Sequence, residues 1–218
     1  MVLLRAFLFS CVLLAVSAVP SAATITPVIS FETAAVVASG ITPGGKVVWF
    51  SVAREIAEHS ATIVPRQQVV EDTTSSGTVR LELERDVPFQ SIWVAVDLTT
   101  GASAVAVPEG YPLRTFEVAP TAARHTEGVV DSIGDTRGYV EVLLVRPATG
   151  AWWATVGDGG ATDGDALYDG QVVASLPDLE EVDGSTEAAP EDFAVDDVIV
   201  ILDPINMEVG IHELKEVE

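Results

Sequence analysis

The chain has 218 residues, of which 33 are acidic and 11 are basic, and its formal net charge is −22 at pH 7. A protein surface of this sign repels phosphate, which makes nucleic acid and anionic membranes poor partners and favours cations and basic partners. The single cysteine, Cys11, lies in the apolar run near the start of the chain, which we expect to be removed. We therefore expect no disulfide framework, no thiolate metal site and no thiol nucleophile.

The first residues have the pattern of a secretory signal peptide. Arg5 precedes an apolar run from Ala6 to Val19, and Ser21-Ala22-Ala23 fits a cleavage site built of small residues. The run is shorter than the roughly 20 residues that a membrane-spanning helix needs. We therefore expect residues 1–23 to be removed and the mature chain to be secreted or periplasmic, with an uncleaved anchor as the alternative.

Beyond this segment, the hydrophobic pattern predicts β-strands almost throughout. The stretch 79–84 alternates three apolar with three charged side chains, which is typical of a half-buried strand. Lys46–Arg54 is apolar on both faces and predicts a central strand. Only Arg54–Ser60 and Pro177–Val182 could form single helical turns. Further strands are expected over Pro27–Phe31, Ala34–Ser39, Ile63–Val70, Ser91–Leu98, Ala102–Val107, Leu113–Val118, Tyr139–Arg146, Ala151–Val156, Ala166–Ala174, Asp197–Leu202 and Met207–Leu214.

Three of these strands lead into the next strand through turns of one design. The turns Asp97–Gly101, Arg146–Gly150 and Asp203–Met207 begin with a charged residue, and the first two end with glycine. Proline fits the second position of a type I turn, and a following glycine can adopt a positive φ. We expect three β-hairpins here, whose Thr-Gly and Asp-Pro pairs are turn chemistry and not an active site.

Two polar stretches organise the chain. Residues 119–138 form an expected linker between an N-terminal unit, 24–118, and an acidic C-terminal β unit, 139–218. Within the second unit, Leu179–Asp197 has eight acids in nineteen residues, which predicts a mobile loop. The N-terminal unit has about eight short strands at roughly ten-residue spacing, as β-sandwiches do. The predicted fold is all-β, an antiparallel sandwich followed by a second small β unit built of hairpins.

The run "AVVASGITPGGKVVWFSVA", Ala35–Ala53, resembles the second-to-third strand region of bacterial immunoglobulin-like domains. In that family an apolar strand is followed by Ser-Gly, an apolar residue, Thr-Pro-Gly and another apolar strand. The resemblance implies an immunoglobulin-like sandwich with a structural, adhesive or binding role, and it implies no catalytic residue. Trp49 and Trp93 are candidates to fill the core of such a sandwich.

The stretch "VGDGGATDGDALYDG", Val156–Gly170, is the strongest candidate for a cation site. Calcium prefers six to eight oxygen ligands, which Asp158, Asp163, Asp165 and Asp169 could help to supply. Their spacing matches neither an EF-hand loop nor a Gly-Gly-x-Gly-x-Asp repeat. From Gly157 to Glu218 there are 18 acidic residues and one basic residue, Lys215. The alternatives are an irregular calcium site and a solvated connection between two strands.

Motifs for other chemistry are not evident. The histidines at 59, 125 and 212 fit no zinc spacing, and the chain has no Gly-x-Ser-x-Gly elbow and no phosphate-binding glycine loop. Trp152 and Trp153 are adjacent, so on a strand they must point to opposite faces. One of the two rings is a candidate for the core, and the other for an exposed platform that stacks on a sugar or on a protein partner.

We therefore expect a secreted, non-catalytic β-sandwich protein with a structural, adhesive or binding role and with calcium as a candidate stabilising ion. A carbohydrate-binding module is the first alternative, because it would use an exposed tryptophan. A small secreted hydrolase is the second, because a Ser-His-Asp triad can assemble from distant residues.

Overall fold

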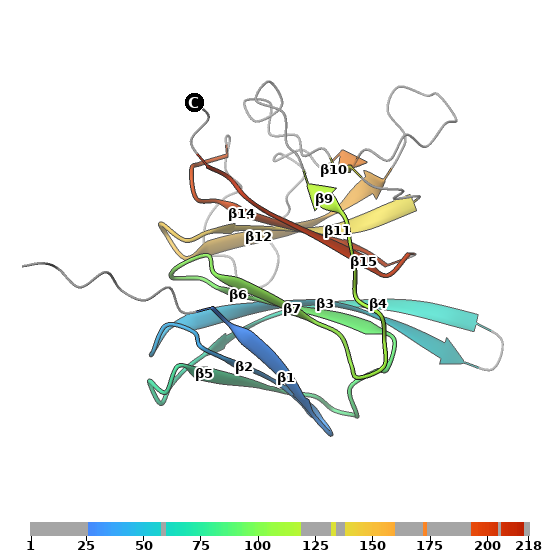
Figure 1. The fold of residues 1–218 in the computed structure, drawn as a ribbon, viewed down its shortest axis with the longest axis horizontal. Coiled ribbons are helices and arrows are strands. Elements are labelled where there is room, and N and C mark those ends of the chain that lie inside the picture. Colours follow the sequence, from blue (N-terminus) through green and yellow to red (C-terminus); the bar gives the residue numbers. More distant parts are fainter. Residues whose placement is uncertain are drawn as a thin grey trace, which may run out of the picture.

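The computed structural model describes residues 26–57, 60–118, 132–133, 138–159, 172–173, 193–204 and 206–215. Every regular element in this part of the chain is a β-strand, which confirms the all-β prediction. Figure 1 shows that the strands form stacked layers, with the N-terminal strands in the two lower layers and the C-terminal strands in the upper layer.

The N-terminal half forms two antiparallel sheets. Sheet A has the strand order β1-β2-β5 and sheet B the order β4-β3-β6-β7. The second strand therefore belongs to one sheet and the third to the other, so the chain crosses between the sheets after Ser39. The strands are β1 (Val28–Glu32), β2 (Ala35–Ser39), β3 (Lys46–Ala57), β4 (Ser60–Glu71), β5 (Thr78–Glu82), β6 (Ser91–Asp97) and β7 (Ser103–Ala106).

The C-terminal half forms sheet C, whose strand order is β13-β12-β11-β14-β15-β8. Its ladders are antiparallel except for that between β15 and β8, which is parallel and two residues long. The hairpins β11–β12 and β14–β15 supply its centre, as expected for a unit built of hairpins. The strands are β8 (Arg114–Thr115), β11 (Gly138–Arg146), β12 (Ala151–Gly159), β13 (Val172–Val173), β14 (Val198–Asp203) and β15 (Glu208–Glu213), and β9 (Glu117–Val118) pairs separately with β10 (Ser132–Ile133).

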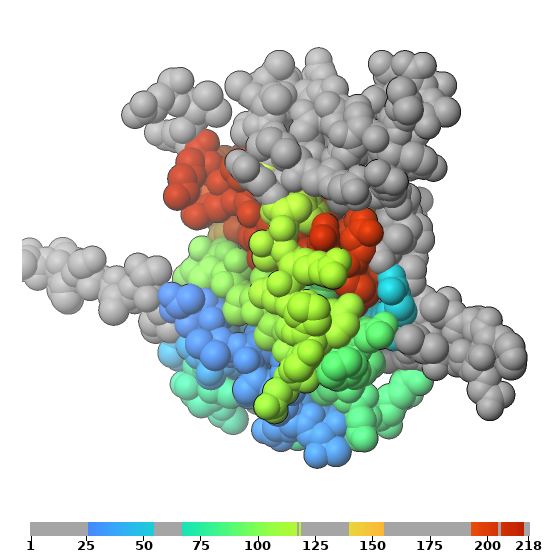
Figure 2. All heavy atoms as spheres, turned by 45° about the vertical axis from the view of Figure 1, so that its right-hand side comes forward, coloured from blue at the N-terminus to red at the C-terminus, as the bar shows by residue number. Residues whose placement is uncertain are grey.

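The strand expected at Leu113–Val118 does not join the N-terminal sheets, although it falls within the expected N-terminal unit, 24–118. Its residues form β8, on the edge of sheet C, and β9. The stretch after β7, coloured yellow-green, runs over the surface from the N-terminal sheets to β15 (Figure 2). The N-terminal sheets therefore end at Ala106, and residues 107–113 connect them to sheet C.

Sheets B and C share one hydrophobic core. Phe50 on β3, Val94 on β6, Leu143 on β11 and Val200 on β14 are all buried in it. A separate core lies between sheets A and B and contains Trp49 and other side chains from the opposite face of β3. This arrangement explains why Lys46–Arg54 is apolar on both faces, since β3 lies in the middle layer, with one sheet on each side.

The two glycines of the hairpin turns have the predicted positive φ, and Met207 has one as well. Gly101, Gly150 and Met207, each at the fifth position of its turn, have φ values of 74°, 71° and 57°. The backbone N–H of Gly101 donates to the carbonyl of Asp97, and that of Gly150 donates to the carbonyl of Arg146. A positive φ in the last turn residue lets each pair of strands continue as a ladder.

The expected helical turn at Arg54–Ser60 is wrong. Strand β3 continues to Ala57 and β4 begins at Ser60, so these residues extend the hairpin, and residues 58 and 59 lie outside the described part. Cross-strand pairing from Arg54 to Ala57 overrides the weak local pattern. The other expected turn, Pro177–Val182, falls entirely outside the described residues.

Several acidic side chains are buried and stabilise turns. The carboxylate of Asp97 accepts hydrogen bonds from Thr42 N, Thr42 Oγ1 and Thr99 N at 2.7–2.8 Å. Asp72 accepts from the backbone N–H groups of Gly77 and Thr74 and from the Thr74 hydroxyl. Burial alone would raise the pKa of Asp72, but its hydrogen bonds outweigh burial and hold that pKa well below its usual range. These carboxylates therefore stabilise turns and do not add to the charge of the protein surface.

Glu141 is the exception among the buried acids that the structure describes, because burial raises the pKa of its carboxyl above the ordinary value. It lies on the same face of β11 as Leu143 and Val145, which belong to the core between sheets B and C. The folded protein therefore holds the Glu141 proton more tightly than the unfolded chain does. The free energy of unfolding should fall as pH rises from the unfolded-chain pKa through the raised pKa.

We expect Glu141→Gln to raise the unfolding temperature at pH 7 by about 2–5 °C, because it removes a poorly solvated charge. The difference from the native chain should vanish when the pH is lowered below about 4.3, where the carboxyl is neutral in both states. Calorimetry at several pH values measures both effects. Equal unfolding temperatures at pH 7 would contradict the prediction.

Candidate binding cleft

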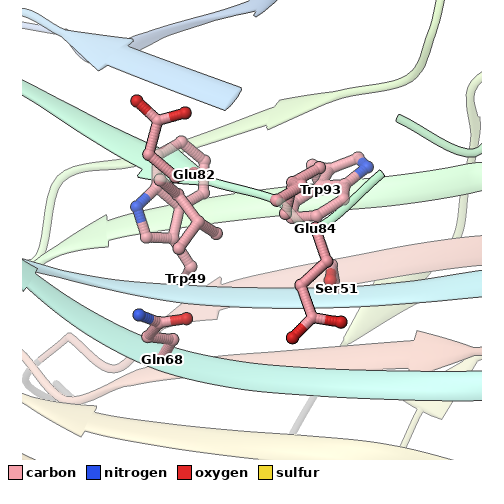
Figure 3. A pocket seen from close by; sticks show the side chains of 8 residues that line it. Trp49, Ser51, Gln68, Glu82, Glu84 and Trp93 are labelled. Atoms are coloured by element: carbon pink, nitrogen blue, oxygen red, sulfur yellow. The ribbon is translucent and has the colours of Figure 1, made fainter. Parts of the chain in front are cut away.

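A cleft with a volume of about 350 Å³ lies at one open side of the N-terminal sandwich, between sheets A and B. Strands β3 and β6 supply its floor, and β4, β5 and the residues just after β5 supply its rim (Figure 3). The residues that line it are Trp49, Ser51, Gln68, Leu81, Glu82, Leu83, Glu84 and Trp93.

The floor of the cleft is apolar and buried. Trp49 and Trp93 are each 1% exposed, and their rings meet edge to face with centroids 6.4 Å apart. Alternation along β3 and β6 directs both rings toward sheet A, where they pack with Leu81. The Trp93 indole N–H donates to Ser91 Oγ at 2.8 Å. The Trp49 indole N–H is buried and has no hydrogen-bond partner among the described residues, which costs about 1–3 kcal/mol.

The rim of the cleft is polar. Gln68 and Glu84 are exposed, and Figure 3 shows the Glu84 carboxylate directed to the side on which Gln68 lies. The carboxylate of Glu82 is directed to the opposite side (Figure 3).

Glu82 already has a partner outside the cleft. The Nε atom of Arg80 donates to Glu82 Oε1 at 2.5 Å, and Nη1 of the same guanidinium contacts Glu32. Hydrogen bonds to Glu82 and then to Glu32 raise the pKa of Arg80. Glu84 is therefore the carboxylate that remains for a ligand in the cleft.

The described side chains that line the cleft are carboxylate, amide, hydroxyl, indole and aliphatic groups, with no lysine or arginine among them. Such a rim can accept hydrogen bonds and attract positive charge, and it disfavours anions. The volume is at the low end for small-molecule sites, which span about 300–1,000 Å³. One small group or one side chain fits it better than an extended ligand.

The structure buries both tryptophans that we considered as a platform. Trp152 is 3% exposed in the core between sheets B and C, and Trp153 is 1% exposed on the other face of sheet C. The expectation of opposite faces is confirmed. A stacking platform needs an exposed ring face, so neither ring can act as one, because sheet C is covered at Trp152 by sheet B and at Trp153 by Arg146 and apolar neighbours.

The candidate cation site is described only at its beginning. Asp158 lies near the end of β12, opposite Tyr139 of β11 and Val173 of β13, whereas Asp163, Asp165 and Asp169 lie outside the described residues. Among the residues that are described, no three His, Cys, Asp or Glu side chains are placed to hold a metal ion. Of the three histidines, only His212 falls in the described part, on β15.

The calcium hypothesis for these four aspartates stays a prediction, and thermal unfolding tests it. If calcium binds the native state and not the unfolded chain, it must raise the unfolding temperature. We therefore expect a higher unfolding temperature in millimolar calcium than with a chelator, and a loss of that increase when Asp163 and Asp165 are both replaced by asparagine. An unchanged unfolding temperature would end the hypothesis.

Sequence reasoning placed Trp49 and Trp93 in a sandwich core but did not find the cleft. Gln68 lies within β4, Glu84 lies just after β5, and the two are 16 positions apart in the chain. No sequence signal distinguishes them from other polar residues in or beside strands.

No family model, no curated protein and no solved structure matches this chain. The described residues also include no helix long and apolar enough to cross a membrane.

Proposed function

We propose that the mature chain is an exported, non-catalytic β-sandwich protein with a binding role, and that the cleft between β4 and β5 is its ligand site. Of the structural, adhesive and binding roles open to such a protein, binding is favoured by the cleft. One observation carries this choice. In a body whose sheets otherwise enclose dense apolar cores, this site combines an apolar floor with a rim of hydrogen-bonding side chains.

We also propose that the N-terminal unit is immunoglobulin-like. Immunoglobulin constant-type sandwiches pair the first, second and fifth strands in one sheet and the third, sixth and seventh in the other. Sheets A and B place these six strands in the same way. The fourth strand differs, because it pairs with β3 in sheet B and not with the first, second and fifth strands. The run Ala35–Ala53 covers β2, the crossing between sheets and most of β3, as the resemblance requires.

Two-dimensional NMR of the four tryptophan indole N–H groups tests the binding role. Substitution of each tryptophan by phenylalanine assigns the signals. The exported protein is then titrated with a panel of small amines, neutral amides and methyl glycosides. A ligand of the cleft should shift the signals of Trp49 and Trp93 and leave those of Trp152 and Trp153 in place. A panel that moves neither cleft signal would count against the proposed function.

A further inference from the structure

The geometry of the cleft points to its ligand class, on the premise of the proposed function that the cleft binds a ligand. We infer that it holds a cationic group on an aliphatic stem, namely the lysine or arginine side chain of a basic partner protein. The inference depends on the charge of the rim, on the arrangement of apolar and polar side chains in the cleft, and on the net charge of the whole chain.

The charge of the rim selects a cation. Glu82 and Glu84 line the cleft, and none of the lining side chains that the structure describes is basic. Arg80 forms an ion pair with Glu82 outside the cleft, so Glu84 is the carboxylate whose charge a ligand can neutralise. An ammonium or guanidinium group there would form a charge-assisted hydrogen bond, and the Gln68 amide oxygen on the same side can accept a second one.

The layering of the cleft suits a long basic side chain. Leu83 is only partly buried where it packs against the cluster of Leu81, Trp49 and Trp93, so it leaves apolar surface accessible. Gln68 and Glu84 lie at the exposed rim. Lysine and arginine place their methylene stems along apolar surface and keep the charged end near water. A neutral sugar ring would instead need an exposed aromatic face, which neither buried indole offers.

The charge of the chain favours the same partner at long range. A net charge of −22 and a calculated pI of about 4.2 give a negative field that accelerates the approach of basic proteins. The complex should therefore weaken as the salt concentration rises, because ions screen exposed charges beyond about 10 Å at 0.1 M.

The test compares three probes by the NMR titration described above. N-acetyl-lysine amide carries the stem and the charge, N-acetyl-norleucine amide carries only the stem, and methyl glucoside is a neutral polyol. We expect the lysine probe to shift the Trp49 and Trp93 signals at a concentration at least tenfold lower than either neutral probe. Glu84→Gln should weaken lysine binding about threefold to tenfold. Glu109→Gln, an equal loss of charge at an exposed position after β7, should change it less than 1.5-fold.

The outcomes separate the inference from the proposed function. If the glucoside or the norleucine probe shifts the same two signals as strongly as the lysine probe, the cation inference is overturned and the cleft remains a binding site. Equal effects of Glu84→Gln and Glu109→Gln would also overturn the cation inference, because they would show that the net charge of the protein alone attracts the lysine probe. If no probe moves the Trp49 and Trp93 signals, the proposed function fails together with the inference.

Discussion

Replacement of Asp197 by alanine should destabilise the protein by about 3–5 kcal/mol, because it leaves the Arg146 guanidinium without its carboxylate. The Asp197 side chain is fully buried and accepts two hydrogen bonds from Arg146, at 2.9 Å from Nε and 2.7 Å from Nη2. It also accepts the backbone N–H of Ala194 at 2.8 Å. The Arg146 guanidinium lies 5.5 Å from the ring centroid of Trp153, so the ion pair is packed into the outer face of sheet C.

Urea unfolding at pH 7 measures this loss, and two further variants interpret it. Glu213→Ala removes an exposed acid from the neighbouring β15 and should cost less than about 0.5 kcal/mol. The double variant Arg146→Met with Asp197→Ala should cost clearly less than the sum of the two single changes, since it leaves no unpaired buried charge. Strict additivity would mean that the pair is not coupled.

The second large effect concerns the contact between sheets B and C. Gly101 has a φ of 74°, and a Cβ atom there would lie 2.8 Å from Cγ of Pro147 and 3.0 Å from Cγ2 of Val198. Gly101→Ala should therefore combine backbone strain of about 1–2 kcal/mol with overpacking of about 1–3 kcal/mol. We expect a total loss of about 2–5 kcal/mol in urea unfolding.

Gly150 offers a matched control for this substitution. It occupies the same turn position with a φ of 71°, but the nearest atom to an added Cβ is the carbonyl oxygen of Leu98 at 3.8 Å. Gly150→Ala should thus cost only the backbone strain. The difference between the two variants measures the packing of one hairpin turn on the other sheet. Equal losses would show that the contact at Gly101 relaxes without cost.

The acidic residues include both solvated side chains and buried side chains that accept hydrogen bonds, and the sequence could not separate these two groups. The eight acids of Leu179–Asp197 predicted a mobile loop, yet residues 193–197 are held by hydrogen bonds to Leu214 and by the Arg146–Asp197 pair. The rest of that loop lies outside the described residues. Asp72 and Asp97 likewise belong to turns and not to a charged surface. Composition counts charges, but only a folded environment decides which charge is compensated.

Local sequence patterns determined the strands and the turns. Strict alternation marked β5, two apolar faces marked β3, and the shared turn design marked three hairpins, because side-chain period and positive φ are local properties of the chain. What covers each apolar face was decided only by the tertiary structure. An apolar face specifies burial but no particular partner, so the sequence could not tell that sheet C covers β3 or that both adjacent tryptophans are buried. The cleft has the same origin, since sheet B brings Trp49, Gln68 and Trp93 together but Glu84, just after β5, joins them only when sheets A and B stack.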